Sequence, residues 1–78
     1  MNMKKMVLWC FNYHDPRIWI ANITGGEQTA MFAHLMDKWN RKCRLVDSTA
    51  TAFLYFFLDI DKEYQDKLEK YIEENYKG

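Results

Sequence analysis

Three segments of the chain are apolar at most positions, and none of them alternates cleanly between apolar and polar residues. They are Met6–Tyr13, Arg17–Ile23 and Phe53–Leu58, and they hold most of the aromatic residues. Short apolar runs rich in aromatic and β-branched residues are typical of strands that are covered on both faces. We therefore expect these three segments to form strands of one sheet.

The first two predicted strands are expected to pair as a hairpin. Residues 12–16 separate them, and Asp15 and Pro16 are residue types that favour turns. A turn centred on these two residues places the small side chains of Cys10 and Ala21 on one face, where a helix packs readily. The opposite face then carries bulkier side chains: Val7, Trp9, Phe11, Tyr13, Ile18 and Ile20.

A helix is expected from Thr24 to about Lys42. Thr24 and Glu27 have the spacing of a capping box, in which each side chain bonds the backbone N–H of the other residue. Apolar residues follow at intervals of four, as one face of a helix requires: Met31, Leu35 and Trp39.

A second helix is expected from Asp59 or Asp61 to about Tyr76, because apolar residues again recur at helical intervals and charged residues lie between them. Arg44–Val46 would add a short fourth strand. The predicted fold class is therefore α+β in a single domain over residues 1–78. It has a three- or four-stranded, mainly antiparallel sheet and two amphipathic helices in the order ββα(β)βα. This order is loosely ferredoxin-like, an architecture that hosts many functions.

Composition and charge make some function classes less favourable than others. The chain of 78 residues is 49% hydrophobic and has a formal net charge of zero at pH 7. A neutral chain is a poor candidate for a dedicated nucleic-acid-binding protein, whose affinity comes largely from neutralising phosphates. The sequence shows no secretory signal and no membrane span. With only two cysteines it predicts a cytoplasmic protein with reduced thiols and no membrane partner.

Residues that could carry chemistry are few and poorly spaced. A nucleophilic Cys10 would need His14 and Asp15 close by, but residues four apart on a strand lie about 13 Å apart. A zinc site from Cys10, His14, His34 and Cys43 would lack the closely spaced ligand pairs of zinc knuckles and ribbons. We therefore expect no enzyme, no catalytic residue, no metal and no cofactor.

The predicted function is that of a small regulatory interaction module. Two helices on one face of the sheet would leave the aromatic face open, and large exposed apolar patches mark contact surfaces. The candidate partner-binding residues are Val7, Trp9, Phe11, Tyr13, Arg17, Ile18 and Ile20. The partner would be another protein or a second copy of the chain, as in a homodimer. The alternative is a module that stacks single-stranded nucleic acid on the same aromatic and basic face. If the helices lie on opposite faces of the sheet, these residues are core.

Overall fold

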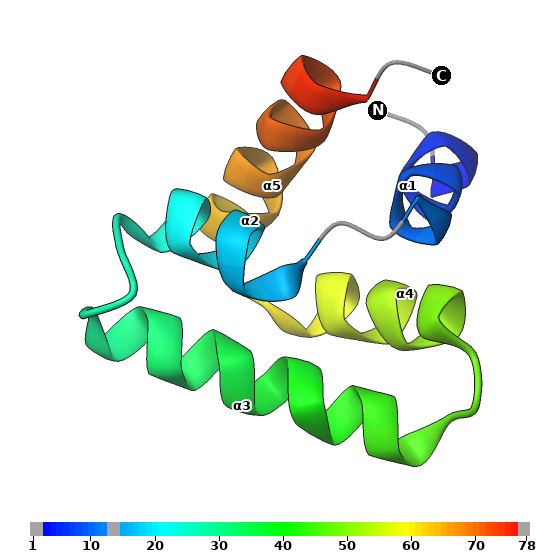
Figure 1. Cartoon of the computed structure of the whole chain (residues 1–78), viewed down its shortest axis with the longest axis horizontal. Coiled ribbons are helices and arrows are strands. Elements are labelled where there is room, and N and C mark those ends of the chain that lie inside the picture. Colours follow the sequence, from blue (N-terminus) through cyan, green and yellow to red (C-terminus); the bar gives the residue numbers. More distant parts are fainter. Residues whose placement is uncertain (1–2, 13–14, 77–78) are drawn as a thin grey trace.

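The computed structural model describes residues 3–12 and 15–76, and within them the chain forms five helices and no strand (Figure 1). The prediction of an α+β fold with a sheet, ferredoxin-like or otherwise, is therefore wrong. The helices are α1 (Met3–Phe11), α2 (Pro16–Thr24), α3 (Ala30–Leu45), α4 (Thr49–Asp59) and α5 (Lys62–Asn75).

The helices pack around one core. Helices α3 and α4 form an antiparallel pair joined by residues 46–48, and Figure 1 shows them side by side. Helix α1 packs against α4 and α5, whereas α2 packs against α3 and α5. Helix α4 therefore has a neighbour on each of two sides, α3 and α1.

Helical spacing explains the segments predicted as strands. In the first of them the buried residues are Met6, Trp9 and Cys10, which are three and four positions apart as on one face of a helix. In the third, Phe53, Phe56 and Phe57 show the same spacing. The missing alternation of polar and apolar residues was interpreted as a strand buried on both faces, but it reflects the 3.6-residue period.

The predicted hairpin turn is the start of a helix. Asp15 is the N-cap of α2, where its Oδ1 atom accepts a hydrogen bond of 2.9 Å from the backbone N–H of Arg17. Pro16 occupies the first helical position, which tolerates proline because the N–H there has no partner within the helix. Asp and Pro favour helix starts as well as turns. Tyr13 and His14 lie outside the described residues.

The predicted helix start at Thr24 is also wrong, because Thr24 is the last residue of α2. Its Oγ1 atom donates a hydrogen bond of 2.8 Å to the carbonyl of Ile20. Gly25 follows with a φ of 92°, a left-handed conformation that glycine adopts without strain at a helix C-terminus. The N-cap of α3 is Thr29, whose Oγ1 accepts a hydrogen bond of 2.9 Å from the N–H of Phe32.

Two predicted helices are present with changed bounds. Helix α5 follows Asp61, one of the two predicted caps, and ends at Asn75. Helix α3 begins later than predicted and runs to Leu45, so the strand expected at residues 44–46 does not form.

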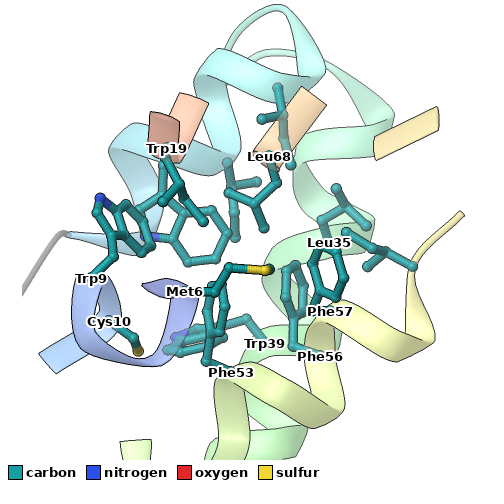
Figure 2. Close-up of a cluster of buried hydrophobic side chains, with 14 residues drawn as sticks. Met6, Trp9, Cys10, Trp19, Leu35, Trp39, Phe53, Phe56, Phe57 and Leu68 are labelled. Atoms are coloured by element: carbon teal, nitrogen blue, oxygen red, sulfur yellow. The ribbon is translucent and has the colours of Figure 1, made fainter. Parts of the chain in front are cut away.

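The core is built from aromatic rings meeting edge to face (Figure 2). The Trp19 ring lies 5.8 Å from the Trp9 ring and 5.6 Å from the Trp39 ring, measured between centroids. It also lies 6.0 Å from Phe53 and 5.6 Å from Phe56. Edge-to-face pairs of this kind add about 0.5–1.5 kcal/mol each to the burial of the rings. The aromatic residues thus join α1, α2, α3 and α4 in one cluster.

Candidate interaction surface

The structure separates the seven residues predicted to bind a partner. Trp9 and Ile20 belong to the core, with exposed fractions of 1% and 0%. Val7 is partly buried, and Tyr13 lies outside the described residues. Phe11, Arg17 and Ile18 are exposed. The six described residues therefore do not form one exposed face, and Trp9 is too buried to stack on nucleic-acid bases.

Helix α4 has an unusual composition for a surface helix. Its residues from Thr49 to Leu58 carry no charge, and apolar side chains lie all round it. A helix that is apolar on every side is normally enclosed by other elements. Since α4 has neighbours on only some of its sides, apolar side chains remain in contact with water.

The exposed side of α4, which we call the α4 outer face, consists of four residues at helical spacing. The buried side of the helix points its phenylalanines into the core, as Figure 2 shows for Phe53, Phe56 and Phe57. On the other side Tyr55 is 50% exposed and Leu58 is 67% exposed. The α4 outer face comprises Thr51, Leu54, Tyr55 and Leu58, of which Thr51 and Leu54 are partly buried.

Charged groups at the C-terminal end of this face pair with one another. Lys38 Nζ of α3 lies 3.1 Å from Asp59 Oδ2, and Lys42 Nζ lies 3.6 Å from the same oxygen. The hydrogen bond from Lys38, aided by the charges of both lysines, lowers the pKa of Asp59 below its ordinary value. The carboxylate is therefore ionised at neutral pH and its charge is balanced by α3.

Leu45 extends the apolar surface at the other end of α4. It is 72% exposed and follows Lys38 by seven residues, which is two helical turns, so the two share one face of α3. Lys38 contacts Asp59, so this face of α3 borders α4. Because the helices are antiparallel, Leu45 lies beside the N-terminal turn of α4 while Leu58 lies in its last turn.

The other exposed large apolar residues lie on α1 and α2, next to charged residues. Met3, Leu8 and Phe11 lie on the outer side of α1 with Lys4, and Ile18 lies on α2 after Arg17. Single exposed apolar residues among charged ones are ordinary on protein surfaces. The α4 outer face differs because it is uncharged along the length of a helix. Sequence reasoning missed it because the segment was interpreted as a strand.

The cysteines are poor candidates for chemistry. Burial raises the pKa of the Cys10 thiol to about 11, with a smaller contribution from Cys43. The Cys10 Sγ atom donates a hydrogen bond of 3.7 Å to the backbone carbonyl of Thr49. Desolvation also raises the pKa of Cys43, which is exposed. Both thiols are therefore mostly protonated at neutral pH, the form that is a weak nucleophile.

The hollow beside the core tryptophans is a poor candidate for a ligand site. It has a volume of about 230 Å³ and is lined by Trp9, Cys10, Asp15, Pro16, Trp19, Trp39 and Thr49. Its volume is below the roughly 300–1,000 Å³ usual for ligand pockets, and the three tryptophans are at most 8% exposed. Among the described residues no group of three or more His, Cys, Asp or Glu side chains could hold a metal ion.

Comparisons with known proteins identify no relative of this chain. No family model, no curated protein and no solved structure matches it. None of the helices in residues 3–12 and 15–76 has the length and apolar character needed to cross a membrane. The function is therefore argued from the surface itself.

Proposed function

We propose that the protein is a non-enzymatic interaction module that binds a protein partner through the α4 outer face. The observation that carries this proposal is the uncharged run from Thr49 to Leu58, whose outward side chains remain exposed although the core already contains the inward ones. Apolar side chains on the outside of a helix add nothing to the packing of the core. A partner that covers them gains their burial.

The energy available indicates reversible binding. Full burial of a large apolar side chain is worth about 1.5–3 kcal/mol, so covering the exposed parts of Tyr55 and Leu58 yields roughly 1–2 kcal/mol each, and covering the partly buried Leu54 yields less. A partner surface of similar size contributes a similar amount. Association costs about 4–15 kcal/mol in lost freedom and offsets most of this gain, so the affinity is weak, in the high micromolar to millimolar range at best. Such an affinity suits a regulatory contact that forms and dissociates.

The proposal can be tested by placing a photo-crosslinking amino acid at position 58 in cells that produce the chain. Position 18 is a matched control, because Ile18 is 55% exposed and lies on α2 instead of α4. We expect a discrete adduct from position 58 and none from position 18. The adduct should be lost when Tyr55→Lys is introduced into the same chain, because this substitution places a charge on the α4 outer face. It should persist when Ile18→Lys is introduced, because Ile18 is similarly exposed but lies on α2.

Two results would contradict the proposal. One is the absence of any adduct from position 58 that Tyr55→Lys removes. The other is the same adduct from both positions, which would indicate a non-specific contact. Tyr55 is at an outward-facing position of α4, and circular dichroism of the Tyr55→Lys variant should show unchanged helix content.

A further inference from the structure

We propose that the occupant of the α4 outer face is a second copy of this chain, bound about a two-fold axis with the two α4 helices antiparallel. This inference rests on the proposed function and specifies its partner. A two-fold interface pairs the same patch on both subunits, so the patch must be complementary to itself. A charged patch would repel its own copy, whereas the α4 outer face carries no charge.

The charge of the whole chain is compatible with this pairing. Its formal net charge is zero at pH 7, so no overall electrostatic repulsion separates two copies. The charged group at the end of the face, Asp59, is balanced by Lys38 and Lys42 within its own subunit. The face therefore does not require a charged partner.

Exposure at the two ends of α4 specifies the antiparallel orientation. Among the described residues the two most exposed large apolar ones are Leu45, at the end of α3 beside the start of α4, and Leu58, in the last turn of α4. In an antiparallel pair each Leu58 approaches Leu45 and Thr51 of the other copy, and Leu54 and Tyr55 lie near the axis. A parallel pair would not bring Leu45 of one copy to Leu58 of the other.

The size of the face predicts a weak dimer. An 11-residue helix is about 16 Å long, so a contact between two of them is at the small end of specific interfaces. We expect a dissociation constant in the high micromolar to millimolar range, so the dimer would be populated only at high protein concentration.

The first experiment measures self-association of the purified chain by sedimentation equilibrium, from roughly 1 μM to 1 mM. We expect a monomer–dimer equilibrium whose dissociation constant rises about 10- to 1,000-fold in Leu58→Lys, because the substitution removes the contact in both subunits. The control Ile18→Lys introduces the same charge at an exposed position of α2 and should leave the dissociation constant unchanged.

The second experiment tests the orientation by disulfide trapping in a Cys10→Ala/Cys43→Ser background. A thiol oxidant such as diamide should link Thr51→Cys to Leu58→Cys when the two variants are mixed. Each variant alone should form little disulfide dimer. Efficient homodimers of each single variant, with no enrichment of the mixed dimer, would overturn the antiparallel arrangement.

The outcomes separate this inference from the proposed function. A wild-type chain that stays monomeric throughout overturns the second copy as partner. In that case an adduct of a different protein at position 58 that Tyr55→Lys removes would still support the proposed function. A dimer weakened by Ile18→Lys and unaffected by Leu58→Lys would overturn both proposals, because the contact surface would then lie away from α4.

Discussion

Ile18 and Ile20 provide a sharp test of the helical architecture, because they are the same residue type two positions apart. In a strand, residues two apart share a face and have similar surroundings. In α2 they do not, since successive residues are rotated by about 100°. Ile20 is 0% exposed and contacts the core, whereas Ile18 is 55% exposed. The two substitutions to alanine should therefore have very different effects.

The expected magnitudes follow from this difference in burial. Truncating a fully buried isoleucine to alanine costs about 2–5 kcal/mol, from lost apolar burial and from the cavity that remains. A domain of this size has a free energy of unfolding of about 4–12 kcal/mol, so Ile20→Ala removes a large share of it. Ile18→Ala should change the free energy of unfolding by no more than about 0.5 kcal/mol, because surface substitutions have small effects and alanine favours helix.

The assay is urea denaturation followed by circular dichroism, at a low protein concentration where association does not contribute. Thermal unfolding should agree, with a melting temperature lowered by about 4–8 °C for each kcal/mol lost. Equal losses for the two variants, or a larger loss for Ile18→Ala, would refute the assignment of residues 16–24 to a helix that packs through Ile20. Measuring Trp19 fluorescence in parallel is of limited value, since Trp9 and Trp39 also contribute.

Three further predictions concern the caps, the thiols and the α3–α4 ion pairs. Thr29→Ala should lower the free energy of unfolding by about 0.5–2 kcal/mol, because it removes the N-cap of α3, and Thr24→Ala should lower it less. A larger loss for Thr24→Ala than for Thr29→Ala in denaturation curves would contradict the assigned helix start. Iodoacetamide should alkylate the exposed Cys43 before the buried Cys10. The rate of Cys10 alkylation should keep rising with pH toward the Cys10 pKa of about 11. Faster labelling of Cys10 than of Cys43 at neutral pH, measured by mass spectrometry, would be inconsistent with its burial. Asp59→Asn should cost at most about 1 kcal/mol near neutral pH, because the ion pairs are partly exposed. The pKa of Asp59 is lowered in the folded state, so the stability that its carboxylate contributes is complete above the ordinary carboxyl pKa and is lost as the pH falls through the pKa of the folded state. The urea midpoints of wild type and Asp59→Asn should therefore converge in strong acid. If the difference between them stays the same there, charge is not its cause.

The two longer amphipathic helices could be predicted from the sequence because their patterns extend over several turns. Helix α3 has 16 residues and α5 has 14, and charged residues separate their apolar positions. In α5 the buried residues Leu68 and Ile72 are one turn apart and lie among lysines and glutamates. With that contrast, the helical period is evident and only the ends of the helices are uncertain.

The three other helices could not be distinguished from strands, for two physical reasons. Helices α1 and α2 have nine residues each and α4 has 11, so each offers only two or three turns in which a period can appear. They also lack the polar face that reveals the period. The residues that mark the boundaries of these segments were ambiguous as well. Asp and Pro, as at positions 15 and 16, favour both turns and helix starts, and Gly, as at position 25, favours both turns and helix ends.

An exposed apolar surface could be anticipated from the sequence, but its location could not. The surplus of apolar side chains over what a small core can hold depends on composition and chain length alone. Which of them point outward depends on the rotation from one residue to the next. Assuming a rotation of 180° placed Trp9 and Ile20 at the surface, whereas the helical rotation places both in the core and leaves Tyr55 and Leu58 outside.

The separation between core and outer face within α4 is the basis for assigning a function to it. Phe53, Phe56 and Phe57 already supply the contacts that α4 makes with the aromatic core. Leu58 makes no comparable contribution, so the folded monomer would tolerate a lysine there, and a polar residue would keep the surface better hydrated. The requirements of folding therefore explain one side of α4 and leave the apolar character of the other unexplained. A contact that covers this second side accounts for it, and Leu58→Lys should then weaken association while the free energy of unfolding of the monomer changes by no more than about 0.5 kcal/mol.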